Sequence, residues 1–262
     1  MSGKVGSDGE EIYYESIGDG SDTVVFCHGL GGNHAVWFQQ VPVFAEHFRV
    51  VTWDQRGFGM STNKALASGP DAAAVDLAAL LDHLDIGRAH LVGQSMGGWA
   101  IVRFALKWPD RVHSLVLADS IGGIVDATVD DILAHAVRRS VPVDEVGRHA
   151  AIADSLVTED PAKAFLYQQL GGFRGQIDQS EMFGKLGSAR YSADDVRLVD
   201  LPALCIVGSQ DDLMPPQVMR HVASILGASC VEVAGAGHSP YFERPAEWNE
   251  AVLDFLNGVA SS

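Results

Sequence analysis

The distribution of apolar residues along the chain predicts short strands separated by helices. Residues 23–27 and 112–119 are largely apolar runs of the length found in strands that are buried on both faces of a sheet. Within residues 71–84, leucines recur at the spacing of one helix face. Patterns of these two kinds predict strands at 11–17, 23–27, 49–53, 88–92, 112–119, 202–207 and 230–234, and helices at 37–47, 71–84, 99–108, 216–226 and 245–257.

Strands and helices alternate in the order that gives a mostly parallel sheet with helices on both faces. The alternation stops after residue 120, and helical stretches without a convincing strand follow at 129–139, 143–156 and 162–170. We therefore predict an α/β core formed by residues 1–120 and 201–262, into which residues 121–200 are inserted as a small helical cap. Several cap side chains either line a substrate pocket or pack the cap onto the core: Phe165, Tyr167, Phe173, Met182, Phe183 and Tyr191.

Composition limits the class of protein. The 262 residues, 47% of them hydrophobic, suffice for one large α/β domain. No apolar run approaches the roughly 20 residues that a membrane span needs, and residues 1–11 are polar and rich in glycine, unlike a signal segment. We therefore expect a cytoplasmic protein without a membrane span. The net charge of −16 argues against nucleic acid as a partner and mildly disfavours anionic substrates.

The three cysteines, Cys27, Cys205 and Cys230, each lie in an apolar, strand-like run. Their number is odd, and no two of them have the C-x-x-C spacing. We predict that they are buried free thiols in a reducing compartment rather than nucleophiles.

A candidate nucleophile follows the strand that ends at Val92. The segment Gly93-Gln94-Ser95-Met96-Gly97 has the G-x-S-x-G pattern and lies between a predicted strand and a predicted helix. In that context the serine sits on a strained turn, and the backbone leaves no room for side chains at the two flanking glycines. The N–H of Met96, at the start of the helix, is then a candidate to stabilise an oxyanion.

A second glycine-rich segment, His28-Gly29-Leu30-Gly31-Gly32, follows the strand at 23–27. Glycines after a buried strand let the backbone approach a ligand, so the N–H of Leu30 is a candidate second oxyanion donor. The alternative is an ordinary flexible turn. Three further side chains flank this region and either contact substrate or pack: His34, Trp37 and Trp99.

Asp54 and Arg56 lie in a charged loop after the strand at 49–53. They could serve catalysis, but we favour a structural role, in which internal hydrogen bonds and ion pairing hold the loop.

A serine hydroxyl needs a base, and histidine suits because its unperturbed pKa is about 6.5. Among the ten histidines, His238 follows a strand and lies among small residues that allow a close approach to Ser95. A carboxylate must orient the imidazole. Asp211 fits the chain order Ser, Asp, His, whereas Asp119 and Asp212 stay open as alternatives.

Taken together, these segments resemble the α/β-hydrolase fold family along nearly the whole chain. The resemblance implies an eight-stranded, mostly parallel sheet with helices on both faces and a small inserted helical cap. It rests on the oxyanion-like segment 28–31, the D-x-R-G-x-G-x-S loop at 54–61, the nucleophile turn at 93–98, the acid loop at 208–211 with Pro215, and the histidine loop at 237–238.

Three positions narrow the resemblance to serine carboxylesterases and enol-lactone hydrolases. Ser95 stands where haloalkane dehalogenases and epoxide hydrolases of this fold have an aspartate nucleophile. Leu30 stands where cofactor-free haloperoxidases usually have an aromatic residue. Gln94 stands where carbon–carbon bond hydrolases often have asparagine.

The residues and the resemblance thus imply a serine hydrolase that cleaves small carboxylic esters through a Ser95, His238 and Asp211 triad and an acyl-enzyme. The N–H groups of Leu30 and Met96 would form the oxyanion hole. We expect no metal or other cofactor, because the histidines lack metal-ligand spacing and no Rossmann or P-loop pattern occurs.

The alternatives are a lactonase, a carbon–carbon bond hydrolase of ring-cleavage type, and a non-catalytic ligand-binding protein of the same fold. A carbon–carbon bond hydrolase that acts on an acidic diketone would need a basic residue in the pocket, and Arg174 or Arg190 could supply it. The physiological substrate, the stereopreference and the oligomeric state are not predicted.

Overall fold

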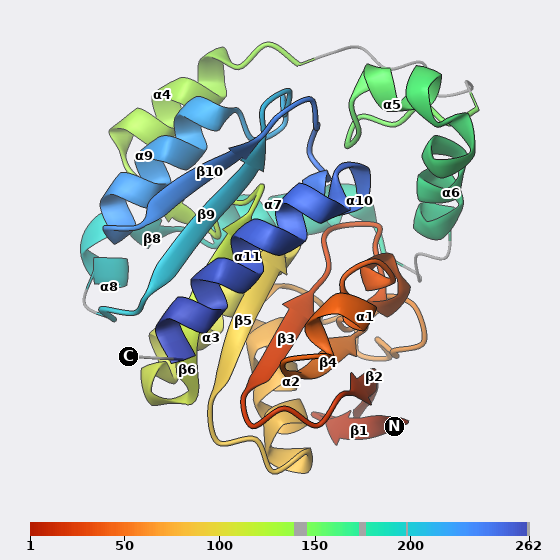
Figure 1. The fold of residues 1–262 in the computed structure, drawn as a ribbon. Helices are drawn as coiled ribbons and strands as arrows, with labels where there is room; N and C mark the ends of the chain where they lie inside the picture. Colours follow the sequence, from red (N-terminus) through yellow and green to blue (C-terminus); the bar gives the residue numbers. More distant parts are fainter. Residues whose placement is uncertain (139–145, 173–176, 198, 261–262) are drawn as a thin grey trace.

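A computed structural model describes residues 1–138, 146–172, 177–197 and 199–260. Its centre is an eight-stranded sheet with the strand order β1-β2-β4-β3-β5-β6-β9-β10 (Figure 1). The first two strands are antiparallel to their neighbours, and the other neighbouring strands are parallel, so the predicted fold class is confirmed. The strands are β1 (Ser2–Ser7), β2 (Glu10–Ile17), β3 (Thr23–Cys27), β4 (Arg49–Trp53), β5 (Ala89–Gln94), β6 (Val112–Ala118), β9 (Ala203–Gly208) and β10 (Ser229–Val233).

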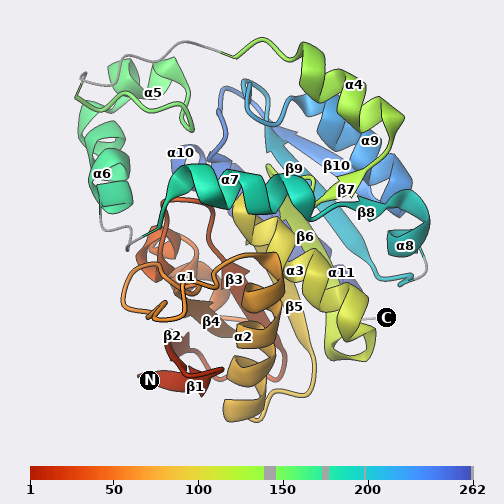
Figure 2. The same ribbon diagram turned by 180° about the vertical axis from the view of Figure 1, so that it is seen from behind.

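Alternate side chains of the central strands enter two separate cores, one on each face of the sheet. Val25 belongs to the core covered by α2 (Pro70–His83), α3 (Met96–Lys107) and α9 (Pro216–Leu226), which Figure 2 shows in part in front of the sheet. Phe26, the next residue, belongs to the opposite core. That core is covered by α1 (Val41–Phe44) and α11 (Pro245–Ala260), which lie in front in Figure 1.

Two N-terminal features differ from the sequence-based expectation. Residues 2–7 form β1 because they pair with β2 along six positions, although within them only Val5 and Ser7 are buried and the hydrophobic signal is weak. The helix expected at 37–47 is instead a 3-10 turn, η1 (His34–Trp37), followed by the short helix α1. Pro42 has no N–H to continue a helix from the preceding turn, which accounts for the break.

Within the predicted insertion, 121–200, the described residues are mainly helical but include a small parallel sheet of two strands, β7 (Ile124–Val125) and β8 (Tyr191–Ser192). The expectation of no strand was therefore wrong here, because a two-residue strand has no detectable alternation. The expected helix at 143–156 falls partly outside the described residues, and helix begins only at residue 154. The helices are α4 (Ala127–His135), α5 (Asp154–Glu159), α6 (Pro161–Gly172), α7 (Gln179–Ser188) and α8 (Ala193–Arg197).

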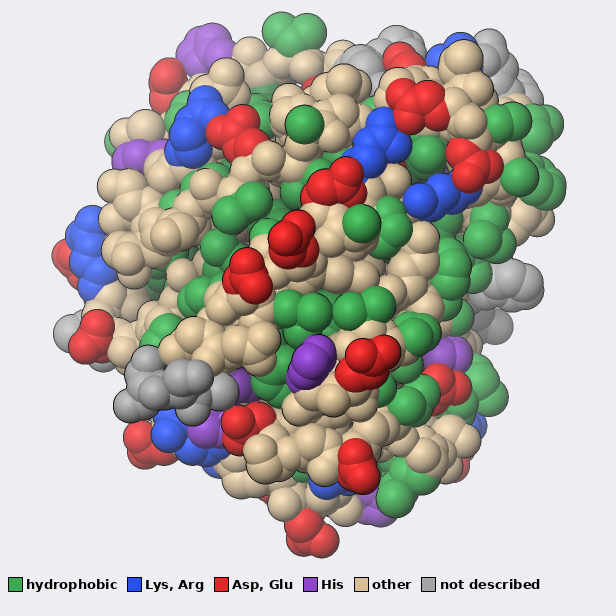
Figure 3. Space-filling model, in the orientation of Figure 1, with side chains coloured by type: hydrophobic (Ala, Val, Ile, Leu, Met, Phe, Trp, Pro, Cys, Tyr) green, Lys and Arg blue, Asp and Glu red, His purple; other side chains and the backbone are tan. Residues whose placement is uncertain are grey.

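The helix α7 crosses the end of the sheet at which the parallel strands terminate, and α5 and α6 lie beside it above α1 (Figures 1 and 2). The remaining short helices are η2 (Pro109–Arg111) and α10 (Pro240–Glu243). Within the described ranges, none of the helices combines the length and the apolar character needed to cross a membrane. Acidic side chains are spread over the face shown in Figure 3, in keeping with the net charge of −16.

Candidate active site

Ser95 lies on a sharp turn between β5 and α3. Its backbone has φ 48° and ψ −118°, a conformation that L-residues rarely adopt. A Cβ atom at Gly97 would lie 2.1 Å from the carbonyl oxygen of Cys27, and one at Gly93 would lie 2.6 Å from the backbone of Gly97. Both glycines are therefore required by the close approach of backbone segments, as the sequence pattern predicted.

The structure brings Ser95, His238 and Asp211 together although they are far apart in the sequence. Ser95 Oγ lies 2.9 Å from His238 Nε2, and His238 Nδ1 lies 2.7 Å from Asp211 Oδ2. The three residues follow β5, β10 and β9, so all come from the carboxyl ends of parallel strands, where sheets of this kind bind ligands. His238 and Asp211 are only 5% and 3% exposed, which shields their interaction from solvent.

Backbone donors fix the orientation of Asp211. Its Oδ1 accepts hydrogen bonds of 2.9 Å from the N–H groups of Leu213 and Met214. Its Oδ2 is left to accept from Nδ1–H of His238, and in that tautomer Nε2 is free to accept from the hydroxyl of Ser95.

Asp119 and Asp212, the two other candidate acids, are placed differently. Asp119 is fully buried after β6, and its Oδ1 accepts a hydrogen bond of 2.9 Å from the N–H of Gly208. Burial and the nearby charge of Asp211 raise the pKa of Asp119 well above its usual range. Asp212 is half-buried, and the hydrogen bonds of the His238 ring go to Ser95 and Asp211.

One cluster of possible metal ligands occurs within the described ranges. One atom each of Asp119, Asp211 and His238 lie within 4.8 Å of one another. Because His238 and Asp211 are hydrogen-bonded to each other there, this arrangement fits a proton-transfer site better than a cation site. The absence of a metal requirement stays a prediction.

The glycine-rich segment after β3 packs against Ser95. A Cβ atom at Gly29 would lie 3.1 Å from Cβ of Ser95. In the part of the chain that the structure describes, the N–H groups of Leu30 and Met96 donate no hydrogen bond to another protein group. These two donors therefore remain available to a ligand beside Ser95, as an oxyanion hole requires.

Two positioning residues near His238 were missed from the sequence. The Gln94 side chain donates a 2.9 Å hydrogen bond to the carbonyl oxygen of His238. The buried carboxylate of Glu243 accepts from the N–H groups of Gly237 and Ser239, on either side of His238. The place of Gln94 directly before Ser95 was a usable signal, whereas nothing in the local pattern singles out Glu243.

The three residues considered as substrate contacts have structural partners. Trp37 is fully buried and stacks with aromatic residues of the core, so this structure leaves it no path to a ligand. Trp99 is 7% exposed and donates a 3.1 Å hydrogen bond to the carbonyl oxygen of Leu186 in α7. His34 Nδ1 lies 2.8 Å from Asp54 Oδ1, which turns its ring toward the charged loop.

Internal contacts hold the charged loop after β4, as predicted. Asp54 accepts hydrogen bonds from the backbone N–H groups of His34 and Met60. Arg56 forms a two-fold ion pair with Asp76 of α2, at 2.6 and 3.0 Å.

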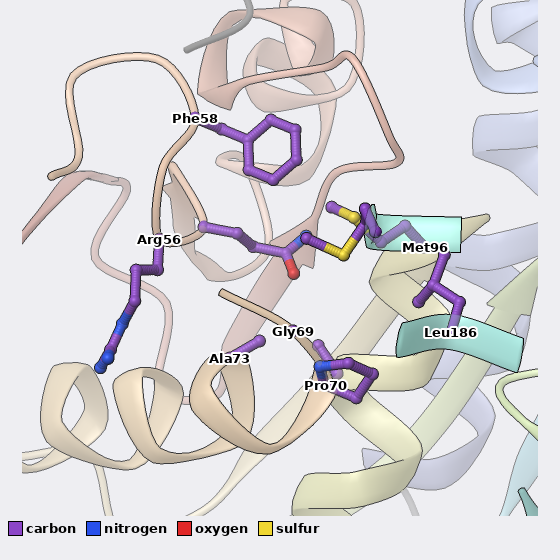
Figure 4. A pocket seen from close by; sticks show the side chains of 10 residues that line it. Arg56, Phe58, Gly69, Pro70, Ala73, Met96 and Leu186 are labelled. Atoms are coloured by element: carbon purple, nitrogen blue, oxygen red, sulfur yellow. The ribbon is translucent and has the colours of Figure 1, made fainter. Parts of the chain in front are cut away.

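A small cavity lies between this loop, α3 and α7. Figure 4 shows Phe58, Met96 and Leu186 converging on it from these three parts of the chain. Its volume of ≈ 10 Å³ is room for about one water molecule, so α7 packs directly against this side of the Ser95 turn. A larger cavity of ≈ 410 Å³ lies between α3, α8 and α9, and none of the candidate site residues lines it.

The side chains of residues 121–200 that were considered for a substrate pocket differ in position and in exposure. The hydroxyl of Tyr167 lies 2.7 Å from Ser239 Oγ, next to His238, and Met182 lines the small cavity. Phe165 and Phe183 are 43% and 62% exposed, and Tyr191 is half-buried.

The two basic residues considered for the pocket are placed as follows. Arg190 is paired with both oxygens of Asp130 at 2.7 and 2.9 Å. Phe173 and Arg174 lie outside the described residues.

Comparison with known proteins identifies a family model and several hydrolases with similar sequences. Residues 24–251 match the sequence model of the alpha/beta hydrolase family. The chain is 33% identical to a 2-hydroxy-6-oxononadienedioate/2-hydroxy-6-oxononatrienedioate hydrolase of Burkholderia vietnamiensis, over 95% of this chain and 92% of that protein. It is 26% identical to 3-oxoadipate enol-lactonase 2 of Acinetobacter baylyi, over 87% of this chain and 86% of that protein.

Among solved structures, an esterase from Thermogutta terrifontis is similar with a TM-score of 0.81 and 24% identity, over 99% of both chains. The enol-lactonase from Burkholderia xenovorans LB400 is similar with a TM-score of 0.76 and 23% identity, over 97% of this chain and 100% of that chain. These similarities establish the fold.

Proposed function

This chain belongs to the alpha/beta hydrolase family, and we propose that it is a serine hydrolase that cleaves carboxylic esters of small molecules. The observation that carries the proposal is the continuous series of hydrogen bonds from Ser95 Oγ through the ring of His238 to Asp211, at 2.9 and 2.7 Å. A nucleophile, a base and a carboxylate that orients the base are the three groups that acyl transfer needs.

In the first half of the reaction, the hydroxyl of Ser95 attacks the ester carbonyl carbon while its proton passes to Nε2 of His238. Asp211 stabilises the imidazolium that forms. The N–H groups of Leu30 and Met96 donate to the oxyanion, where the loss of one such donor typically costs about 10²–10³ in rate. The tetrahedral intermediate then releases the alcohol, which takes its proton from His238.

In the second half, water attacks the acyl-enzyme. His238 removes a proton from the water and returns it to Ser95 Oγ as the carboxylic acid leaves. Every proton moves through His238, so the chemistry requires no metal and no other cofactor.

We further propose that residues 121–200 act as a cap that bounds the substrate site. Two contacts support this role. Trp99 joins the helix after the nucleophile to α7 through its hydrogen bond to Leu186, and Tyr167 joins α6 to the histidine loop through Ser239. The shape of the cap would then set the length of the acyl or alcohol group that the site accepts.

The overall charge of the protein favours uncharged esters and lactones as substrates. The protein carries a net charge of −16, and Arg190, the described cap arginine considered for an anionic substrate, is paired with Asp130. A carboxylate-bearing substrate would have to break that pair or find another cation.

The second candidate is hydrolysis of a carbon–carbon bond in a ring-cleavage type diketone. The observation that favours it is the 33% identity to a hydrolase whose name specifies a dienedioate, a substrate with two carboxylates. The same Ser95 and His238 would serve that reaction, so substrate preference rather than the triad separates the two candidates.

Hydrolysis of a p-nitrophenyl ester series from acetate upward tests the proposal. Wild type, Ser95→Ala and the control Ser229→Ala, which changes an exposed serine, are assayed in parallel. We expect turnover by wild type and the control and a loss of up to about 10⁶-fold in Ser95→Ala. Equal turnover in Ser95→Ala would contradict the proposal. Cleavage of a 2-hydroxy-6-oxo-dienedioate without ester or lactone turnover would establish the second candidate instead.

A further inference from the structure

The carboxyl group of Asp119 has an unusual setting for an ionisable side chain. Asp119 follows β6, is 0% exposed and has a backbone φ of 48°. Its Oδ1 accepts one hydrogen bond from Gly208, but its Oδ2 is buried and has no hydrogen-bond partner in the described part of the chain. A buried, negatively charged oxygen without a hydrogen-bond partner has a high desolvation cost. The protonated form of the carboxyl group avoids this cost.

The neighbour of Asp119 is Asp211, the acid of the proposed triad. Asp211 accepts three N–H hydrogen bonds, from Nδ1 of His238 and from the backbone of Leu213 and Met214. An ionised carboxylate offers about four lone-pair positions, so one position on Asp211 is left. An oxygen of Asp119 lies within 4.8 Å of an Asp211 oxygen and a His238 nitrogen.

Two carboxyl groups this close share one site, and like charges there disfavour the ionisation of both. The donors decide which group carries the charge. Asp211 faces three donors, one of which becomes a cation during the reaction, whereas Asp119 faces one backbone N–H. The charge therefore belongs on Asp211 and the proton on Asp119.

We propose that Asp119 is a protonated carboxylic acid whose Oδ2–H donates a hydrogen bond to the carboxylate of Asp211, and so positions the Asp211–His238 pair. The inference rests on the proposed function, because it assigns a role beside the proposed triad. Asp119 is a positioning residue in this account. It acts through Asp211, by fixing the rotation of that carboxylate and by moderating its attraction for the imidazolium.

The other titratable groups around Asp119 support its neutral form. Glu243 of α10 is a further acid nearby. Burial raises the pKa of both Tyr167 of α6 and Tyr241 of α10, so these phenols stay neutral and offer no positive charge to an ionised Asp119. His238 is the one group of this set that can become positive, and it is bonded to Asp211.

Asp119→Asn is the decisive variant because its amide has the shape and neutrality of the protonated acid. Its carbonyl can accept from Gly208 and its NH₂ can donate to Asp211. We expect kcat/KM close to that of the wild type and an unchanged acid limb of the pH profile. If Asp119 is ionised, the same variant removes a negative charge beside the imidazolium and moves the acid limb to lower pH by about one unit or more, which overturns the proposal.

Asp119→Ala removes the donor and should behave differently. The loss of a hydrogen bond to a charged group predicts a fall in kcat of about tenfold to a hundredfold. The acid limb of the pH profile should move to higher pH. Without the hydrogen bond from Asp119, the carboxylate of Asp211 stabilises the protonated ring of His238 more strongly. A merely structural role would lower activity without this shift. Alanine kinetics equal to those of the wild type would refute the positioning role.

Infrared spectroscopy tests the proton without any substrate. A protonated carboxyl has a C=O stretch that is separate from the carboxylate bands. We expect this band in wild-type protein at neutral pH and its loss in Asp119→Asn, but not in Asp110→Asn, which changes an exposed aspartate. If no band is lost in Asp119→Asn, the proposal fails even where ester hydrolysis succeeds. A lost band in a protein without ester turnover would instead mean that only the proposed function had failed.

Discussion

Glu243 offers a sharp test of how the proposed cap is joined to His238, the proposed catalytic base. Its side chain is 2% exposed, and its carboxylate accepts three backbone N–H groups: Gly237 at 2.9 Å, Ala153 at 2.7 Å and Ser239 at 3.3 Å. Two of these donors flank His238, and the third belongs to the segment that leads into α5. One carboxylate therefore links the histidine loop to the proposed cap.

The expected magnitude follows from those contacts. Hydrogen bonds to charged groups contribute about 1.5–3 kcal/mol each, but burial opposes ionisation and raises the pKa of Glu243, so the three do not simply add. We expect Glu243→Ala to lower the free energy of unfolding by about 3–5 kcal/mol. In Glu243→Gln, one amide oxygen can still serve Gly237 and Ser239, but the NH₂ faces the N–H of Ala153. That mismatch should cost about 1–3 kcal/mol.

Urea denaturation measures the change, with Glu250→Gln, an exposed glutamate of α11, as the matched control. Amide hydrogen exchange gives a local readout, and in Glu243→Gln it should accelerate at Ala153, whose N–H loses its acceptor. We also expect kcat to fall, because a looser loop holds His238 less firmly against Ser95. The reasoning is refuted if Glu243→Gln and the control unfold with free energies that agree within about 0.5 kcal/mol.

Three further variants test the site and the fold. Gly97→Ala should fail to reach the native state, as judged by circular dichroism of the purified protein, because its Cβ would lie 2.1 Å from the carbonyl oxygen of Cys27. Asp211→Asn should keep the fold but lower kcat by about 10⁴-fold in the ester assay; a loss below tenfold would mean that another group orients the base. The hydrogen bond from Thr62 lowers the pKa of Glu10 from 4.5 to about 2, so the stability that Glu10 contributes is present above pH 4.5 and is lost as the pH falls toward 2. Acid titration of unfolding should show this loss in wild type and not in Glu10→Gln.

The parts of the fold that the sequence predicts are those whose signal is local. The run at 23–27 is fully buried as β3, and Gly93 is required by the backbone of Gly97 within the same turn. By contrast, β1 depends on pairing with β2, and the two-residue strands β7 and β8 depend on each other across the inserted region. Strands that depend on a partner in this way, β1, β7 and β8, show little periodic pattern of their own.

The same distinction applies within the site. Ser95 and His238 could be located from the chain because each follows a strand and sits among small residues. The acid could not be fixed in this way, since Asp119 and Asp211 both follow buried strands. Their difference arises where β9 meets the histidine loop: a Cβ at Gly208 would lie 1.9 Å from the carbonyl oxygen of Gly237.

That close approach brings the loop after β9, rather than the end of β6, to Nδ1 of His238. Asp119 instead lies behind this pair: its Oδ1 accepts from the N–H of Gly208, and its Oδ2 is buried without a hydrogen-bond partner in the described part of the chain. A chain-order rule can select Asp211, but it gives no reason for a second buried carboxyl. The reason that we propose lies in the lone pairs of Asp211: three of them accept from N–H groups, and the fourth is open to the proton of a neutral Asp119.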